Sequence, residues 1–238
     1  MRDPVSPLSP LSPLARHDLL TVTPGAWSRV LAGRPDLAEI PHLAGWAERG
    51  WPVIARRRGP GEDAGLVAAG LPLPPALGKR RIGLALDPGS VTPRPGLTLT
   101  EAGGAAPAAW HPTIAALVAH GAAHGCVPRV FGGLLWQALT GLPYLSDTSD
   151  LDLLWPDSLD RAFLAHASLD RAFLGGLARI AGPAPMRLDG EICLPDGFAV
   201  NWRELHAAGP DEAVLVKGLL RLELRPVAAL RAALSPAA

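Results

Sequence analysis

The sequence is short of cysteine, of net charge and of long apolar segments. Its two cysteines, Cys126 and Cys193, do not form a CxxC motif, so we expect neither a disulfide framework nor a thiolate metal site. The 238 residues offer room for a sizeable core without such crosslinks. Acidic and basic residues number 22 each, and this balance excludes general attraction to nucleic acid or to acidic membrane surfaces. We therefore expect no nucleic-acid partner.

The chain also lacks a hydrophobic stretch suited to a signal peptide or a membrane span. Its first residues, MRDPVSPLSPLSPL, contain no apolar core segment. Residues 102–128 carry no formal charge, but they contain Pro107, Pro112, three histidines and few large apolar side chains. Such a composition is poorly suited to a bilayer. We expect a cytoplasmic protein with no membrane partner.

Proline and glycine divide the chain into a leader and two domains. Residues 1–14 repeat a Ser-Pro-Leu unit, and proline blocks helix and sheet pairing, which predicts an extended leader. Residues 88–109 are rich in proline, glycine and alanine. We expect them to connect an N-terminal domain, residues 15–105, to a C-terminal domain, residues 106–238. Apolar patterning in the first domain predicts strands at 18–23, 51–56, 66–69 and 81–86, with helix inside 26–40.

The second domain has a clearer order of elements. His111 and Pro112 fit a helix start, and this helix is predicted to run to about His124. Further helices are predicted at 134–139 and 158–180, and strands at 127–131, 149–155, 186–194, 198–202, 214–217 and 220–224. The long helix contains a repeated heptapeptide, Ser-Leu-Asp-Arg-Ala-Phe-Leu, that starts at Ser158 and again at Ser168.

Asp150 and Asp152 are the residues that point most clearly to chemistry. They are two apart on a predicted strand, so both side chains would share one face. Two carboxylates placed side by side repel each other unless a cation lies between them, and oxygen ligands of this kind suit Mg²⁺. The backbone at Gly132-Gly133, just before a predicted helix, could approach a phosphate closely. Together these features predict a site for Mg²⁺ and a polyphosphate.

A third carboxylate is expected on a later strand. Asp189 follows the long helix, and the order of elements could place it beside the strand that carries the two aspartates. Glu191 lies two residues further on the same face and is the alternative. His120 and His124 are spaced i, i+4, but no further ligand pattern accompanies them, and we expect them to be solvated or packed in the core.

These motifs carry a resemblance to known enzymes. The order Gly-Gly, Asp-x-Asp and a later Asp resembles the DNA polymerase β-type nucleotidyltransferase superfamily. From about Arg16 to Leu224, the chain is similar to the phosphoribosyl-dephospho-CoA transferases, the holo-acyl-carrier-protein synthases of malonate decarboxylase. The stretches that carry this similarity are Arg16-His-Asp-Leu-Leu, Trp51-Pro-Val-Ile-Ala-Arg-Arg, Gly70-Leu-Pro-Leu-Pro, Lys79-Arg-Arg-Ile, Trp136-Gln-Ala-Leu-Thr-Gly-Leu-Pro-Tyr, Ser149-Asp-Leu-Asp-Leu-Leu-Trp, Arg187-Leu-Asp-Gly-Glu, Ala199-Val-Asn-Trp-Arg-Glu-Leu and Val214-Leu-Val-Lys.

The resemblance implies an α+β fold, in which a small N-terminal α/β domain precedes a polymerase-β-like nucleotidyltransferase domain with a mixed sheet. It implies a Mg²⁺-dependent enzyme that transfers a prosthetic group from triphosphoribosyl-dephospho-CoA to a serine of the malonate decarboxylase acyl carrier protein, with release of pyrophosphate. Asp150 and Asp152 would hold Mg²⁺, and Asp189 would bind a second metal ion or deprotonate the serine. The family often has serine where this chain has Gly133, so a hydroxyl contact to phosphate is absent here.

The positive charge that such a donor needs lies in short basic runs. Arg56-Arg57-Arg58 and Lys79-Arg80-Arg81 flank predicted strands of the first domain, and arginine forks match phosphate geometry. Alternation along a strand sends neighbouring side chains opposite ways, so we expect some of these arginines, but not all, to reach the donor. Lys217 could meet the donor phosphates, pair with Asp189, or serve as a solvated edge residue. The predicted substrate-binding residues are Gly132, Gly133, Ser149, Arg56, Arg57, Arg81 and Lys217.

Two other functions stay open at the level of the sequence. The chain could be another Mg²⁺-dependent nucleotidyltransferase that modifies a small molecule or a protein hydroxyl. It could also be a non-catalytic module of the decarboxylase assembly in which the site has decayed.

Overall fold

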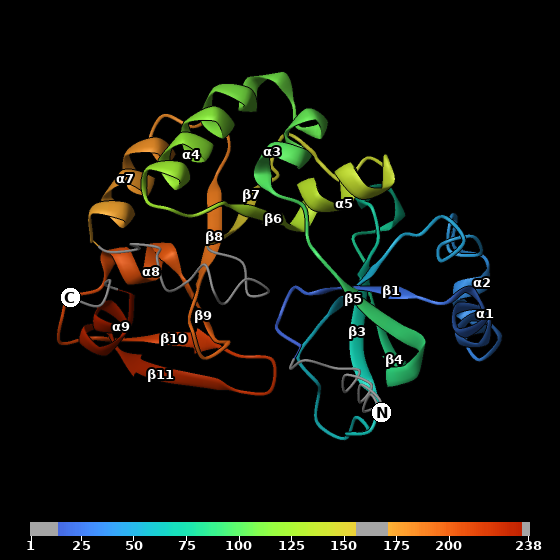
Figure 1. Cartoon of the computed structure of the whole chain (residues 1–238). Coiled ribbons are helices and arrows are strands. Elements are labelled where there is room, and N and C mark those ends of the chain that lie inside the picture. The colour runs from blue at the N-terminus through green and yellow to red at the C-terminus, as the bar shows by residue number, and fades with distance from the viewer. Residues whose placement is uncertain (1–13, 156–170, 235–238) are drawn as a thin grey trace, which may run out of the picture. The chain divides into compact units, whose positions relative to one another are not determined.

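A computed structural model describes residues 14–155 and 171–234 of the chain (Figure 1). The chain divides into two compact units. The first contains residues 1–71 and 82–94, and the second contains residues 72–81 and 95–238. All but the last residue of the predicted leader, and the repeat that starts at Ser158 and Ser168, lie outside the described residues.

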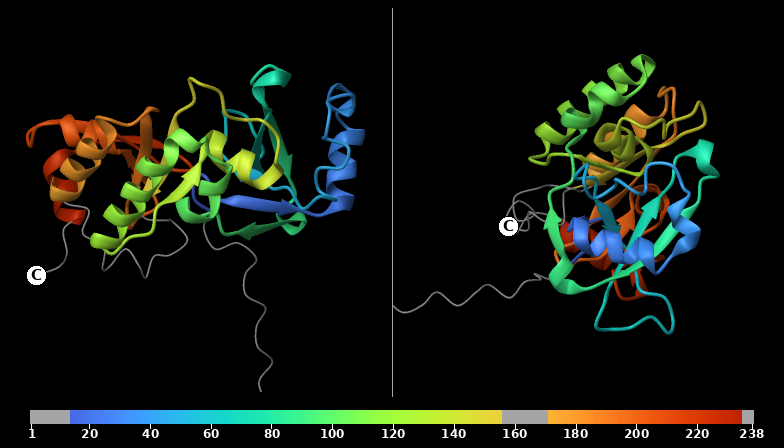
Figure 2. Two further views of the ribbon diagram at one scale, coloured as in Figure 1. Left: turned by 90° about the horizontal axis from the view of Figure 1, so that it is seen from above. Right: turned by 90° about the vertical axis from the view of Figure 1, so that its right-hand side faces the viewer.

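The first unit is built on a five-stranded sheet with the strand order β4-β3-β2-β1-β5. β1 pairs antiparallel with β2 and β5, and β2 pairs antiparallel with β3. The helices α1 and α2 lie together beside these strands (Figures 1 and 2). The bounds are β1 Leu19–Val22, α1 Pro24–Ala32, α2 Pro35–Ala38, β2 Val53–Ala55, β3 Val67–Pro72, β4 Arg81–Leu86 and β5 Val91–Arg94.

Local capping and two buried tryptophans hold the helical side of this unit. The Thr23 side chain caps α1 by accepting from the backbone N–H of Ala26. Trp27 is fully buried, and its Nε1 donates to the carbonyl oxygen of Leu43 at 2.6 Å, so its polar edge is satisfied inside the core. The other apolar side chains buried here include Leu19, Leu20, Val22, Leu37, Trp46, Val53, Ala69 and Leu71.

The expectation of an irregular connection at residues 88–109 is only partly right. Val91–Arg94 forms β5, which pairs with the whole length of β1. Pro93 hides this strand in the sequence, but β5 is an edge strand in the order of the sheet, where a residue without an N–H is tolerated. A short helix follows, α3 (Leu99–Ala102), and Thr98 and Glu101 close its first turn as a capping box.

The second unit is built on a six-stranded sheet with the strand order β11-β10-β9-β8-β7-β6. β7 and β8 are parallel, and the other paired neighbours are antiparallel. The sheet is therefore mixed, as expected, and the fold is α+β. The strands are β6 Arg129–Phe131, β7 Leu151–Trp155, β8 Leu188–Cys193, β9 Ala199–Asn201, β10 Ala213–Lys217 and β11 Leu222–Pro226.

The helices of this unit contribute large apolar side chains to its core. α4 and α7 lie side by side (Figure 1), and Phe173 of α7 packs edge-on against Trp155 at 5.2 Å between ring centroids. His120 stacks on the same phenylalanine, and its Nε2 lies 3.0 Å from the Phe173 carbonyl oxygen, so it packs between helices. The bounds are α4 His111–Ala123, α5 Gly132–Thr140, α7 Arg171–Ala181, α8 Trp202–Ala207 and α9 Val227–Leu234.

The two cysteines lie in the interior of the protein. Cys126 and Cys193 are free and buried, and burial raises the pKa of the Cys126 thiol to about 12. Within residues 14–155 and 171–234, no helix combines the length and the apolar character that crossing a bilayer requires.

Candidate active site

The turn between β6 and α5 brings the backbone of Gly132 close to the carboxylate of Asp152. Phe131, the last residue of β6, is paired with Asp152 of β7. Gly132 follows with φ at +64°, and a Cβ at this position would lie only 2.0 Å from Asp152 Oδ2. Only glycine combines this backbone conformation with this approach. A Cβ at Gly133 would meet Leu145 Cδ2 at 3.0 Å, so a larger residue there requires the leucine to move.

Asp152 faces a second aspartate on the neighbouring strand. β7 and β8 run parallel, and their register pairs Asp152 with Asp189. Burial, followed by the negative charges of Asp189 and Asp150, raises the pKa of Asp152 to about 7, although the positive charges of Arg187 and Arg81 act in the opposite direction. The site therefore concentrates negative charge that is only partly compensated.

The spacing of Asp150 and Asp152 predicts that both lie on one strand, but Asp150 lies just outside it. β7 begins at Leu151, whose backbone N–H donates to the Arg187 carbonyl oxygen at 2.9 Å. Asp150 therefore comes one residue before the first hydrogen bond between β7 and the chain that leads into β8. Its Oδ2 lies 3.7 Å from Arg187 Nη1, and Arg187 Nη2 lies 3.4 Å from Asp189 Oδ2. Arg187 therefore links the two outer aspartates of the site.

Ser149 has a local structural contact rather than a free hydroxyl. Its Oγ accepts from the backbone N–H of Ser146 at 2.9 Å, and its own N–H donates to the Ser146 carbonyl oxygen at 3.0 Å. These bonds close the turn that delivers the chain to Asp150. The predicted contact of Ser149 with phosphate would have to form from within this turn.

Asp189 is held by two hydrogen bonds to the same oxygen. Its Oδ1 accepts from the Gly190 backbone N–H and from Asn201 Nδ2, both at 2.8 Å. Asn201 also caps α8, because its Oδ1 accepts from the backbone N–H groups of Arg203 and Glu204. The other carboxylate oxygen, Asp189 Oδ2, forms the ion pair with Arg187.

The structure separates Glu191 from the aspartates. Glu191 is 6 % exposed and forms an ion pair with Lys217, at 3.6 Å between Nζ and Oε1. It is paired in register with Leu154, whereas Asp189 is paired with Asp152. Of the two alternatives for the third carboxylate, Asp189 is the one that lies in the cluster. The suggested pairing of Lys217 with Asp189 is wrong, because the lysine is committed to the buried glutamate.

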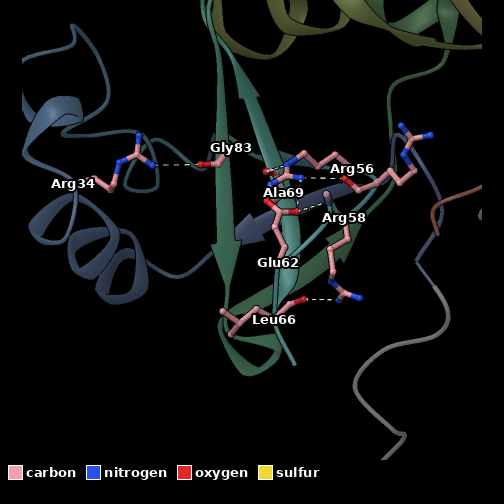
Figure 3. A network of polar contacts seen from close by, with 9 residues as sticks. Arg34, Arg56, Arg58, Glu62, Leu66, Ala69 and Gly83 are labelled. Atoms are coloured by element: carbon pink, nitrogen blue, oxygen red, sulfur yellow. Dashed lines mark hydrogen bonds and ion pairs between the residues drawn. The ribbon is translucent and has the colours of Figure 1, made fainter. Parts of the chain in front are cut away.

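The arginines of the first unit form a network of their own (Figure 3). Arg56 pairs with Glu62 and donates from Nε to the Ala69 carbonyl oxygen at 2.9 Å. The hydrogen bond from Arg56 is the main reason why the pKa of Glu62 is lowered to about 2. Arg58 Nη2 donates to the carbonyl oxygens of Ala64 and Leu66. Arg56, predicted as a donor-binding residue, is thus used to hold the loop that follows β2.

Arg57 and Arg81 differ from these two arginines. Arg57 is exposed, while Arg56 and Arg58 are half-buried, but β2 ends at Ala55, so these arginines do not alternate along a strand as expected. Arg81 is exposed at the start of β4 and belongs to the second unit, where its charge acts on Asp152. Of the predicted basic residues, Arg81 is therefore the one whose charge acts on Asp152.

Comparison with known proteins covers nearly the whole described chain. Residues 15–94 match the model of the phosphoribosyl-dephospho-CoA transferase MdcG N-terminal domain, and residues 98–228 match that of the MdcG C-terminal domain. The chain belongs to this family. A phosphoribosyl-dephospho-CoA transferase from Bradyrhizobium diazoefficiens is 43 % identical over 211 residues, which is 88 % of each chain.

Two further relatives with the same name show similar agreement. The protein from Xanthomonas campestris pv. campestris strain 8004 is 43 % identical over 74 % of this chain and 79 % of its own. The one from Xanthomonas axonopodis pv. citri is 38 % identical over 93 % of this chain and 99 % of its own. No solved structure gives a significant match. The resemblance read from the sequence motifs is thereby confirmed at the level of the MdcG family.

The side chains of this MdcG family member fit a divalent cation in their chemistry. Asp150, Asp152 and Asp189 supply only carboxylate oxygens, the ligands that Mg²⁺ prefers, and their mutual repulsion contributes to the raised pKa of Asp152. Among the described residues, no three His, Cys, Asp or Glu side chains are already grouped to hold a metal ion. Arg187 lies between two of the aspartates instead. Binding of a metal ion would therefore require these side chains to draw together.

Arg187 and Asn201 lie in the stretches that carry the family resemblance, but no role was predicted for either of them. Both had a signal that could have been used. An asparagine directly before a helical pattern is a preferred N-cap, and Arg187 lies two residues before Asp189, the spacing that places side chains on one face of a strand. What the sequence could not give is that both side chains meet the same aspartate.

Proposed function

We propose that this protein transfers the phosphoribosyl-dephospho-CoA group from its triphosphate precursor to a serine of the malonate decarboxylase acyl carrier protein. The observation that carries the proposal is the pairing of Asp152 with Asp189 across parallel strands, directly beside the Gly132 backbone. Membership of the MdcG family and the name shared by its relatives support the choice of transferred group.

In this proposal the serine Oγ attacks the phosphorus nearest the ribose of the donor. An O–P bond forms to the serine while the bond from that phosphorus to the pyrophosphate oxygen breaks, and pyrophosphate leaves. A bound Mg²⁺ supplies neutralisation of phosphate charge and in-line orientation. The aspartates at positions 150, 152 and 189 would hold it. The effect of the negative charges of Asp189 and Asp150 on the pKa of Asp152 supports this role.

The chain's own groups account for the other requirements of the reaction. Asp189 Oδ2, the oxygen that Gly190 and Asn201 do not engage, is suited either to hold the metal ion or, where Asp150 and Asp152 hold the metal ion, to orient the serine hydroxyl and take its proton. The backbone N–H groups at the start of α5 can donate hydrogen bonds to phosphate oxygens, because a helix N-terminus favours an anion. Arg81 adds positive charge on the same unit.

The decisive experiment is intact-mass analysis of the carrier protein after incubation with triphosphoribosyl-dephospho-CoA, Mg²⁺ and this protein. We expect one added phosphoribosyl-dephospho-CoA group and equimolar pyrophosphate. Asp152→Asn and Asp189→Asn are expected to slow labelling by more than about a hundredfold. Asp211→Asn, in an exposed turn, is the matched control because it removes the same charge from the same unit.

Two outcomes would contradict the proposal. Addition of AMP when ATP is supplied, without a need for the dephospho-CoA donor, would identify another nucleotidyltransferase. A carrier that stays unmodified by folded protein, with no Mg²⁺-linked binding of the donor in calorimetry, would identify a non-catalytic module.

A further inference from the structure

Arg187 is the one cation that directly bridges two aspartates of the site among the described residues. Its guanidinium lies 3.7 Å from Asp150 Oδ2 and 3.4 Å from Asp189 Oδ2. Its charge also acts to lower the pKa of Asp152, but burial has the larger effect and the pKa is raised overall. One arginine therefore compensates part of the charge of three aspartates.

These contacts differ from those of Arg203 and Arg225, two arginines of the same unit that form closer contacts. Arg203 Nε donates to the Leu188 carbonyl oxygen at 2.8 Å, and Arg225 approaches Asp196 at 2.6 Å with a side chain that is 23 % exposed. The Arg187 side chain is 61 % exposed, and its ion-pair distances exceed the 2.7–2.9 Å typical of a charge-assisted hydrogen bond. Exposed pairs of this kind contribute little to folding stability.

The backbone of Arg187 is hydrogen-bonded to the sheet, whereas its guanidinium is exposed. Its carbonyl oxygen accepts from the Leu151 N–H at the first step of the parallel β7–β8 pairing. The side chain therefore starts from a defined point beside the carboxylates, and its exposed guanidinium can turn away without disturbing the sheet. A long side chain anchored in this way is suited to exchange one anionic partner for another.

Charge repulsion gives a reason for such an exchange. The Arg187 guanidinium and a divalent cation would compete for the same carboxylate oxygens of Asp150 and Asp189. The two positive charges also repel each other at short distance. A triphosphate arriving at the same site brings several negative charges. Guanidinium forks match phosphate oxygens in geometry, so the displaced arginine gains a new partner as it loses the old one.

We propose that Arg187 is a substrate-binding residue that pairs with the metal-binding carboxylates Asp150 and Asp189 before the metal binds and transfers to the donor triphosphate when the metal binds. This inference rests on the proposed function, because it takes the Mg²⁺ site and the triphosphate donor from it. It predicts opposite effects of one substitution on two ligands. Loss of a purely structural ion pair would not tighten the binding of either ligand.

The first measurement is Mn²⁺ binding to the full chain, followed by electron paramagnetic resonance in the absence of any phosphate. Arg187→Gln is expected to bind Mn²⁺ about three- to tenfold more tightly than wild type, because a competing positive charge is gone. Arg187→Lys keeps the charge and should bind Mn²⁺ like wild type. Arg179→Gln, an exposed arginine on α7, controls for the change in net charge.

The second measurement is binding of the magnesium complex of tripolyphosphate, followed by calorimetry. Arg187→Gln is expected to weaken this binding about tenfold, and Arg187→Lys to weaken it less, because lysine keeps a charge but lacks the planar fork. Arg179→Gln should leave it unchanged. Circular dichroism and thermal unfolding establish that each variant is folded.

The outcomes distinguish this inference from the proposed function. If wild type and Arg187→Gln bind Mn²⁺ equally, or if tripolyphosphate binding is unchanged, the exchange is refuted while the metal site stands. If neither protein binds Mn²⁺, the metal site and the exchange both fall. Binding of Mn²⁺ to Arg187→Gln alone supports the exchange in its strongest form.

Discussion

Gly132 shows how much a single position constrains this site. A methyl group there would overlap Asp152 Oδ2, and the backbone is left-handed with φ at +64°. We expect Gly132→Ala to reduce carrier labelling at least about a hundredfold, because displacement of a reacting group by about 1 Å costs that much. The rate of labelling and the affinity for Mn²⁺ should fall together.

The same helix offers a matched control for this prediction. Gly141, the residue after α5, has φ at +70°, but a Cβ there would meet nothing within 4 Å. Gly141→Ala carries the same backbone strain, about 1 kcal/mol, without touching a carboxylate. If both variants lose labelling equally, strain in the helix and not the contact with Asp152 is responsible.

Asn201 combines two roles that substitution can separate. Its Oδ1 caps α8 and its Nδ2 donates to Asp189. Serine is a good N-cap but is too short to reach the aspartate, so Asn201→Ser should keep most of the capping energy, whereas Asn201→Ala should lose about 1 kcal/mol. Denaturant unfolding measures this difference.

Both Asn201 variants lose the hydrogen bond to Asp189, and that loss should appear in catalysis. We expect kcat for labelling to fall about tenfold in each, from loss of a hydrogen bond to a charged group, with KM for the donor nearly unchanged. A serine variant with wild-type kcat would leave Asn201 with capping as its whole role.

At the scale of the element, β8 depends on a glycine for its approach to β7. Gly190 has φ at +151°, and a Cβ there would lie 2.3 Å from the Leu153 carbonyl oxygen. We expect Gly190→Ala to destabilise the fold by about 1–3 kcal/mol, as overpacking does, and to weaken Mn²⁺ binding by spreading Asp152 from Asp189. Gly104→Ala, with open space around its Cβ position, is the control.

The elements themselves could largely be predicted from the sequence. The strand at 81–86 and the helix that starts at His111 are confirmed by β4 and α4, because alternation and a proline in the first turn are local signals. β5 was missed, since Pro93 argues against a strand unless the strand is known to lie at an edge. Edge position depends on the whole sheet and has no local signature.

The candidate site was predictable in its members but not in its contacts. Gly132, Asp152 and Asp189 were identified by motif and resemblance, and the structure brings them together. The partners of Lys217 and Arg56 could not be read from the sequence, because each bonds to a glutamate whose position depends on strand register or on a loop. Long-range pairing of charged side chains is a tertiary property, for which spacing along the chain gives no rule.

At the scale of the whole molecule, the clustering of aspartates links stability to both pH and metal. Asp152 has an ordinary pKa of 3.8, and in the folded chain its pKa is about 7. The contribution of this group to the stability of the metal-free protein is therefore fully present below about pH 4 and is lost as the pH rises toward 7. In that range the folded state holds a proton that the unfolded chain has released.

Mg²⁺ must displace this proton to bind, so its stabilising effect should grow with pH. A difference of about 1.5 pH units below the raised pKa corresponds to about 2 kcal/mol of lost binding energy. We expect excess Mg²⁺ to raise the unfolding temperature of the full chain clearly at about pH 8 and by much less at about pH 5.5. Asp152→Asn removes the titrating group and should flatten this dependence. An equal Mg²⁺-induced shift at both pH values in the wild type would show that the metal does not bind at Asp152.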